Sequence, residues 1–201
     1  GLRALSAPSR LEGAVILRAF LDLEGSSLGR HSFPVEVAWV FEDGAEEGHL
    51  IRPAVRWKEW EPPARSLHRI PLDLLESDGL PVETVARRLV DSLSGHEVYA
   101  DAPSWDGDWV GMLLRSAGLP GGALQLVDID AGLEELARAI LAPSLPSSDI
   151  PRATHRILAD ASARFAGRPR AQRALGDARL SRERWLAVSG LAHAYREGSG
   201  S

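Results

Sequence analysis

The hydrophobic and polar positions in the first part of the chain predict three consecutive strands. Residues 16–23 form an apolar run that ends in acidic residues and leads into a turn-rich segment of glycine and serine. Residues 35–41 are apolar on both faces apart from Glu36, as expected of a strand inside a covered sheet. The Asp-Gly pair at 43–44 indicates a hairpin turn into a third strand at 48–52.

Farther along the chain, helical spacing alternates with short apolar runs. Apolar residues recur at helical spacing over 82–93 and again over 110–117. Two further strands are predicted at 97–100 and 123–129, and the remainder is predicted to be helical with breaks at prolines and glycines. Three strands followed by two that alternate with helices indicate an α/β fold, with a mixed five-stranded sheet flanked by helices.

Composition limits the kind of protein this chain can be. Its 201 residues, of which 44% are hydrophobic and 25% charged, suit one soluble domain with a sizeable core. No apolar stretch approaches the roughly 18 to 20 residues that a membrane span needs. The absence of cysteine excludes disulfides and thiolate metal sites, and a cytoplasmic location is the default expectation.

The net charge of −5 argues against a protein that coats long nucleic acids, because such binding depends on many Lys and Arg contacts with phosphates. An enzyme that handles a single nucleic-acid end remains compatible with this charge. Metal ions bound by an acidic site reverse its sign locally.

A pair of carboxylates marks the end of the first predicted strand. Asp22 and Glu24 are two residues apart, so their side chains point to one face of the strand. Carboxylates held together raise each other's pKa unless a cation lies between them. Hard oxygen ligands of this kind suit Mg²⁺ or Mn²⁺. Taken alone, the pair is also consistent with an ordinary polar strand end.

The residues around this pair resemble a known motif. Residues 20–29, FLDLEGSSLG, are similar to the first motif of the DEDD 3′–5′ exonuclease superfamily, usually Phe-x-Asp-x-Glu-Thr-Thr-Gly-Leu. Residues 34–38 resemble its second strand, and the likeness runs over about residues 16–195. It implies an RNase H-like fold. The expected organisation is an N-terminal extension (1–14), a single exonuclease-like domain (15–196) and a flexible tail (197–201).

Two more motifs extend the resemblance. Trp105-Asp106 is similar to the second motif, although the His-Asn that usually precedes it is absent. Asp177 stands in a segment that resembles the third motif, whose aspartate is the fourth metal ligand. The resemblance implies two Mg²⁺ or Mn²⁺ ions that promote in-line hydrolysis of a phosphodiester. Asp22 would bridge both ions. Glu24 and Asp177 would complete one side of the site and Asp106 mainly the other.

The resemblance also implies a substrate and a place for it. The expected substrate is the 3′ end of short or single-stranded RNA or DNA, and the sequence does not choose between the two. No membrane partner is expected, and a homodimer is left open because members of the superfamily are frequently dimers. The predicted substrate-binding residues are Gly25, Ser26, Ser27, Leu28, His68 and Trp105.

One position departs from the pattern. In the DEDDh branch, a histidine five residues before the last aspartate acts as general base, and this position is Gln172 here. An amide can hydrogen-bond a water molecule but cannot accept its proton, and loss of a general base costs about 10²–10⁴-fold in rate. Two hypotheses follow: a 3′–5′ exonuclease impaired by Gln172, or a catalytically degenerate nucleic-acid-binding or regulatory module.

Two rival assignments stay open at this point. Asp108 competes with Asp106, which is preferred because an aromatic residue directly precedes it and it begins the periodic helix. His155 and Asp160 preserve the His-x4-Asp spacing of the third motif. Asp177 is preferred because glycine and proline break the chain just before this motif and a long helix follows it.

A few other polar and aromatic residues have a structural interpretation. Glu36 needs a partner if it is buried. Trp57 and Trp60 are expected to pack rather than to stack on bases. A solvated helix face is expected for the basic cluster Arg164, Arg168, Arg170 and Arg173.

Overall fold

Five strands form one sheet in the order β3-β2-β1-β4-β5. The computed structural model describes residues 17–60 and 68–198. β1 pairs antiparallel with β2 and β2 with β3, whereas β1 and β4, and then β4 and β5, run parallel. Parallel pairing requires crossover connections, which the helices supply. The strands are β1 (Leu17–Gly25), β2 (Pro34–Phe41), β3 (Glu46–Leu50), β4 (His96–Ala100) and β5 (Leu126–Asp128).

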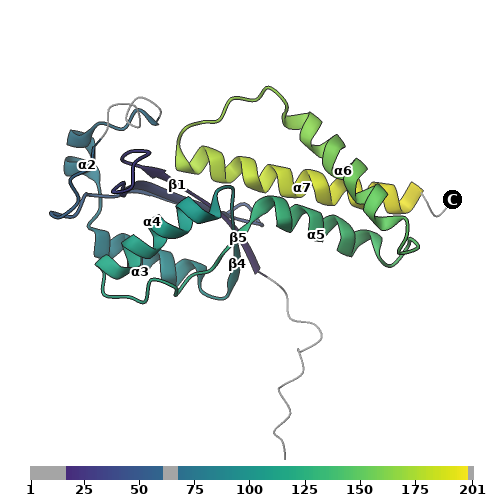
Figure 1. Cartoon of the computed structure of the whole chain (residues 1–201), viewed down its shortest axis with the longest axis horizontal. Helices are drawn as coiled ribbons and strands as arrows, with labels where there is room; N and C mark the ends of the chain where they lie inside the picture. Colours follow the sequence, from purple (N-terminus) through teal and green to yellow (C-terminus); the bar gives the residue numbers. More distant parts are fainter. Residues whose placement is uncertain (1–16, 61–67, 199–201) are drawn as a thin grey trace, which may run out of the picture.

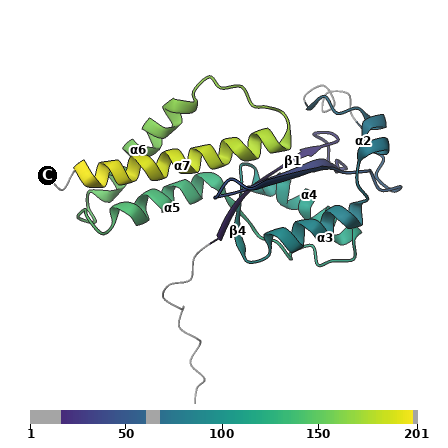
Figure 2. The same cartoon turned by 180° about the vertical axis from the view of Figure 1, so that it is seen from behind.

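Helices lie on both faces of the sheet (Figure 1). α3 and α4 pack together on one face, and α5, α6 and α7 form a layer on the other that extends past the sheet (Figure 2). A long loop returns from α6 to the start of α7, close to the end of β1 (Figure 1). The helices are α2 (Leu72–Asp78), α3 (Val82–Leu93), α4 (Pro103–Ser116), α5 (Ile129–Leu141), α6 (Ile150–Phe165) and α7 (Ala174–Gly198).

The alternation of side chains along β1 decides where the acidic residues lie. Leu21 belongs to the hydrophobic core under α3 and α4. Phe20 belongs to the opposite core, where its ring centroid lies 5.7 Å from that of Trp185 on α7. Because successive side chains of a strand point to opposite faces, Asp22 and Glu24 share the face of Phe20. They therefore point to the side of the sheet that α7 covers.

The predicted mixed sheet flanked by helices is confirmed. Several bounds differ from the sequence prediction: the third strand, predicted over 48–52, is Glu46–Leu50, and the helix predicted over 110–117 already begins at Pro103. The seven-residue helix α2 was not predicted, because it is too short to show a helical repeat. The fifth strand, predicted over 123–129, spans only Leu126–Asp128. It ends there because the Asp128 carboxylate accepts hydrogen bonds from the backbone N–H groups of Asp130 and Ala131 and so caps α5.

Parts of the predicted organisation lie outside the described residues. These parts are the extension over 1–14, residues 15–16 and 61–67 of the predicted domain, and residues 199–201 of the predicted tail. α7 continues through Gly198, two residues into the segment predicted as a flexible tail. The division into domains therefore stays a prediction. Within residues 17–60 and 68–198, no helix combines the length and apolar character needed to cross a membrane.

Candidate metal centre

Three carboxylates converge where β1 ends and α7 begins. Asp22, Glu24 and Asp177 each offer an oxygen atom, and these atoms all lie within 4.8 Å of one another. Asp177 belongs to the first turn of α7, and the other two belong to β1. All three residues are half-buried. Carboxylate oxygens at this spacing match the ligands that Mg²⁺ and Mn²⁺ prefer.

Asp106 supplies a fourth acidic group beside this set. It lies in the first turn of α4, is buried, and its Oδ2 has no hydrogen-bond partner among the described residues. Burial is the largest cause that raises the pKa of Asp106 to about 7. Its charge in turn contributes to the raised pKa of Asp22, so the two carboxyl groups are close enough to repel each other. The rival residue Asp108 is exposed, and burial is what separates it from Asp106, since neither belongs to the three carboxylates within 4.8 Å.

Nearby arginines do not offset the burial and mutual repulsion of the clustered carboxylates. Burial and the neighbouring charges of Asp106, Glu24 and Asp177 raise the pKa of Asp22 well above its ordinary value. Burial, with Asp177 and Glu36 as further causes, raises the pKa of Glu24 to about 7. A divalent cation would reverse both effects, because it favours the ionised form of every ligand. The residues therefore fit the hard metal ion that the sequence motifs imply.

Contacts at the start of α7 hold Asp177 in place. The backbone N–H of Ala171 donates to the Asp177 carboxylate over 3.1 Å. A Cβ on Gly176 would lie 2.3 Å from that of Ala171, so only glycine allows this approach. Glu36 accepts hydrogen bonds from the Arg173 guanidinium and from the backbone N–H of Ala174. The expectation that buried Glu36 has a partner is confirmed, and the partner positions the helix that carries Asp177.

Gln172 lies at the edge of the cluster, in the loop that precedes α7. Its backbone has a φ of 52°, in the left-handed region that non-glycine residues seldom adopt. The backbone of Gln172 hydrogen-bonds the Asp177 carboxylate and lowers its pKa, against the larger effect of burial. The position that a general base occupies in the DEDDh pattern is therefore next to the candidate metal ligands.

The loop after β1 is held by its own serines. The Ser26 hydroxyl accepts from the N–H of Phe33 over 3.0 Å, and the Ser27 hydroxyl accepts from the N–H of Gly29 and donates to Glu59. Both serines are buried. The hydroxyls of Ser26 and Ser27 therefore stabilise the loop. A contact between the substrate and the backbone groups of these serines stays a prediction.

Exposed apolar side chains lie beside this loop. Gly25 allows the Trp109 ring to pack against the backbone, since a Cβ on Gly25 would lie 2.1 Å from a ring carbon. The ring centroid of Trp105 is 5.8 Å from that of Trp109, and Trp105 is 47% exposed. Leu28 is 68% exposed. Of the predicted substrate-binding residues, Leu28 and Trp105 are the side chains that are free to meet a ligand.

His68 is buried and hydrogen-bonded to the backbone. Its Nδ1 accepts a hydrogen bond from the N–H of Ile70 over 3.0 Å. Burial lowers the pKa of the imidazole, and the nearby charge of Glu36 opposes this. The imidazole therefore packs beneath the surface of the protein, and its predicted contact with substrate stays a prediction.

No family model matches the sequence, and no curated protein matches it. Solved structures do match. Exonuclease I of E. coli in complex with a dA16 oligonucleotide has a TM-score of 0.62 and 15% identity, over 90% of this chain and 43% of that chain. Exonuclease I of Methylocaldum szegediense has a TM-score of 0.62 and 19% identity, over 86% of this chain and 40% of that chain. The chain has the fold of exonuclease I.

The likeness to exonuclease I confirms the RNase H-like fold predicted from the motifs. A third match, the zinc-bound complex of E. coli exonuclease I with single-stranded DNA, has a TM-score of 0.59 and 15% identity. It covers 91% of this chain and 41% of that chain. The chain spans less than half the length of these exonuclease I structures.

The second candidate for the third motif lies elsewhere in this fold. His155 and Asp160 are exposed on α6, and Asp160 pairs with Arg156 at 3.9 Å. Neither belongs to the carboxylate cluster. The structure thus brings Asp177 and not Asp160 against Asp22.

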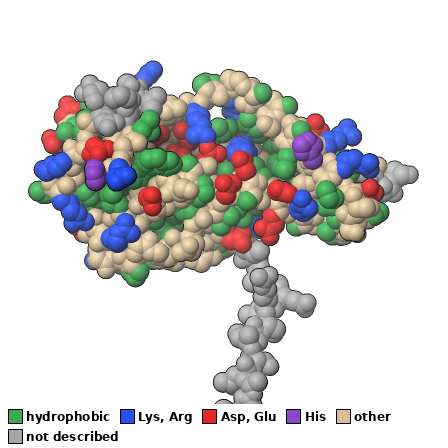
Figure 3. Space-filling view, viewed as in Figure 1, with side chains coloured by type: hydrophobic (Ala, Val, Ile, Leu, Met, Phe, Trp, Pro, Cys, Tyr) green, Lys and Arg blue, Asp and Glu red, His purple; other side chains and the backbone are tan. Residues whose placement is uncertain are grey.

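The basic cluster is a solvated helix face, as expected, only at Arg164, which is exposed on α6. Arg168, Arg170 and Arg173 precede α7 in a loop, because the helix begins only at Ala174. Arg168 pairs with Glu183, and Arg170 pairs with Asp101. Acidic and basic side chains accordingly stand side by side across the middle of the face in Figure 3. The sequence signal for this arrangement was weak, since the acidic partners are distant in the chain.

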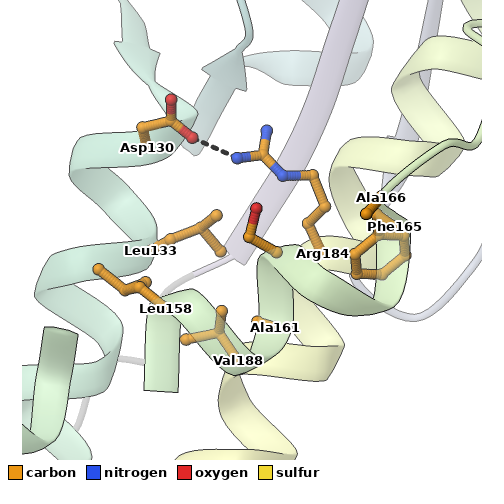
Figure 4. A pocket seen from close by; sticks show the side chains of 9 residues that line it. Asp130, Leu133, Leu158, Ala161, Phe165, Ala166, Arg184 and Val188 are labelled. Carbon is orange, nitrogen blue, oxygen red and sulfur yellow. Dashed lines mark hydrogen bonds and ion pairs between the residues drawn. The ribbon is translucent and has the colours of Figure 1, made fainter. Parts of the chain in front are cut away.

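An apolar cavity of about 460 Å³ lies beside these ion pairs, between α5, α6 and α7. Leu133, Leu158 and Val188 are among its apolar lining residues, and an ion pair between Asp130 and Arg184 stands at one side (Figure 4). The carboxylate cluster is not part of its lining. This cavity is therefore separate from the candidate metal centre.

Proposed function

We propose that this chain is a divalent-metal-dependent 3′–5′ exonuclease that acts on the ends of short or single-stranded RNA or DNA. The observation that carries the proposal is the convergence of Asp22, Glu24 and Asp177 within 4.8 Å at the end of β1. The exonuclease I fold supports the reaction class. Complexes of exonuclease I with single-stranded DNA support the substrate class.

The four acids have distinct roles in this proposal. Asp22, which shares the three-carboxylate set and whose pKa is raised by the charge of Asp106, would help to hold both ions. Glu24 and Asp177 would hold one ion, and Asp106 would hold the other with Asp22. Bound Mg²⁺ or Mn²⁺ supplies an activated water and stabilises the charge on the phosphate oxygens.

The substrate end is proposed to lie over the loop after β1. Leu28 and Trp105 present exposed apolar surface there, and the backbone of Gly25 runs beside the ligands. An aromatic ring stacks on any base, so Trp105 would hold a terminal nucleotide without choosing its sequence. Gln172 would orient a water molecule by hydrogen bonding but would not take its proton.

Gln172 favours one alternative function. A chain that lacks the general base and keeps the ligands can bind metal and nucleic acid with little turnover. On this alternative, the chain is a nucleic-acid-binding or regulatory module with the fold of an exonuclease. Measured turnover separates the two functions.

The test is release of label from 3′-labelled single-stranded oligonucleotides in the presence of Mn²⁺. The enzyme proposal predicts release that EDTA stops and that Asp22→Asn lowers at least about 100-fold, because an essential ligand is lost. Asp108→Asn, a neighbour of Asp106 that lies outside the cluster, should keep the wild-type rate. Binding of the oligonucleotide without any release would favour the binding module. Release that Asp22→Asn leaves unchanged would refute the site.

A further inference from the structure

The segment after β3 carries three exposed basic side chains that the candidate metal centre does not use. Arg52, Arg56 and Lys58, here called the basic strip, form no ion pair with any described residue. By contrast, Arg173 before α7 and Arg179 on α7 are both paired with acids. The basic strip is therefore a local concentration of unpaired positive charge on a chain whose net charge is −5.

The packing of this segment leaves the basic side chains at the surface. Trp57, between Arg56 and Lys58, packs on Phe33, with the two ring centroids 5.4 Å apart. Arg56 donates a hydrogen bond to the hydroxyl of Ser116 at the end of α4, which uses only part of the five N–H donors of its guanidinium. A cation is favourable at a helix C-terminus, but this accounts for Arg56 alone.

One end of the basic strip meets the loop after β1. Glu59, which directly follows Lys58, accepts hydrogen bonds from the hydroxyl of Ser27 and from the backbone N–H of His31. The exposed side chain of Leu28 lies on the same loop, between these two contacts in the sequence. Lys58 is therefore next to the loop over which the substrate end is proposed to lie.

The other end of the basic strip is fixed to the body of the protein. The backbone N–H of Arg52 donates to the carbonyl of Leu80 over 2.9 Å. Six residues of extended chain span at most about 20–22 Å, so the strip offers its charges over the length of a few nucleotides. Glu83 is the one acid that lines the hollow beside Arg52 and Arg56, so positive charge prevails there.

We propose that the basic strip binds phosphates of a single strand upstream of the 3′ end that lies at the carboxylate cluster. The inference rests on the proposed exonuclease function, because that function places the end of the strand. Contacts to phosphates do not depend on the bases, and RNA and DNA both provide them. Strands long enough to reach the strip consequently bind more tightly than a dinucleotide does.

The test is the salt dependence of binding, measured by fluorescence anisotropy. The probe is a single strand of about twelve nucleotides, within the usual site sizes of single-strand binders, with phosphorothioate linkages at its 3′ end. Each phosphate contact on a single strand adds about 0.7 to the slope of log affinity against log salt. Replacing Arg52, Arg56 and Lys58 together by Gln should therefore lower this slope by about 2. Between about 50 and 200 mM salt, the wild type should lose about 20-fold more affinity than the variant.

The matched control replaces Arg152, Arg156 and Arg164 together by Gln. This change removes the same charge from exposed positions on α6, in the helical layer that extends past the sheet (Figure 1). The control should keep the wild-type slope, and Val55→Ala, which leaves the strip charged, should keep it too. Thermal unfolding establishes that each variant is folded. Equal slopes for the two triple variants would overturn the inference.

Binding of a dinucleotide separates this inference from the proposed function. A dinucleotide has one phosphodiester, which lies at the cluster when it is cleaved, so no phosphate is left for the strip. If the wild type binds a dinucleotide as tightly as the longer strand, the inference is refuted and the exonuclease proposal stands. Loss of the longer strand's advantage in the triple variant, without any cleavage by the wild type, would support the strip and contradict the exonuclease proposal. If the wild type binds neither strand, both fail.

Discussion

Glu36 on β2 and Arg173 before α7 are 137 positions apart and form a two-pronged ion pair. Arg173 Nη2 lies 2.6 Å from Oε1 of Glu36, and Nε lies 3.0 Å from Oε2. The N–H of Ala174, the first residue of α7, donates to the same carboxylate over 3.0 Å. A negative charge at a helix N-terminus is favourable. The sheet thereby fixes the turn that carries Asp177.

Replacing Glu36 should loosen this connection. Glu36→Gln is expected to lower the free energy of unfolding by about 1–3 kcal/mol, because hydrogen bonds to a buried charge are lost. Urea denaturation measures this change. The control is Glu46→Gln, which removes a contact between β3 and Arg179 of α7 near the protein surface and should cost much less. If the two losses of stability are equal, Glu36 does not hold the start of α7 to the sheet.

The stability of the metal-free chain should fall as the pH rises toward neutrality. Burial raises the pKa of Glu24 and of Asp106 to about 7, from ordinary values of 4.5 and 3.8, and raises that of Asp22 well above its ordinary value. The folded chain then holds protons that the unfolded chain has released, so stability falls as pH rises from about 5 to about 7.5. Melting temperatures in EDTA across this range measure the effect.

Removing one charge from the cluster provides the control for this pH effect. Asp22→Asn should raise the melting temperature of the metal-free chain at pH 8, because a buried repulsive charge is gone. It should also abolish the rise that Mn²⁺ causes in the wild type. Asp108→Asn should do neither. A wild-type melting temperature that increases steadily from pH 5 to pH 8 in EDTA would contradict the raised pKa values.

Trp105 is expected to contribute to binding of the substrate and little to stability. Trp105→Ala should weaken oligonucleotide binding by about 1–3 kcal/mol, the usual contribution of one stacked base. Fluorescence anisotropy with an oligonucleotide whose 3′ end carries phosphorothioate linkages measures binding without cleavage. Val55, which is 88% exposed outside the candidate site, offers a control in Val55→Ala. Equal affinities for the two variants would exclude the stacking role.

Gln172→His should increase the rate of 3′ cleavage. A general base contributes about 10²–10⁴-fold, and histidine tolerates the left-handed backbone found at this position. Gln172→Asn is the control, since asparagine also adopts this conformation but cannot accept the proton. The rate of the histidine variant should rise with pH through about 6.5. Equal rates for the two variants would show that this position does not deliver a base.

Much of the candidate site could be predicted because the short stretch of sequence around each residue carries a recognisable pattern. Asp22 and Glu24 end an apolar strand, and a residue two positions from another in a strand shares its face. The helix that follows Asp106 and the chain break before Asp177 are likewise visible in short stretches of sequence. Where two candidates competed, burial separated Asp106 from exposed Asp108.

The features that were missed depend on contacts between distant segments. Nothing near Arg170 in the sequence shows that Asp101 lies beside it, because the two meet only when the loop before α7 returns to β4. The burial of His68 depends on the packing of the loop around it. α2, with seven residues, is too short for hydrophobic periodicity to define it, and β5 was predicted but has only three residues.

The central claim is that Asp22, Glu24 and Asp177 hold a divalent ion. Anomalous diffraction from crystals grown with Mn²⁺ tests it most directly, because the manganese signal locates the ion without assuming its ligands. We predict a strong peak within about 2.0–2.4 Å of an oxygen of each of the three carboxylates, as expected for a hard cation of this kind. A peak bound only elsewhere on the protein, or no peak at the end of β1, would contradict the claim.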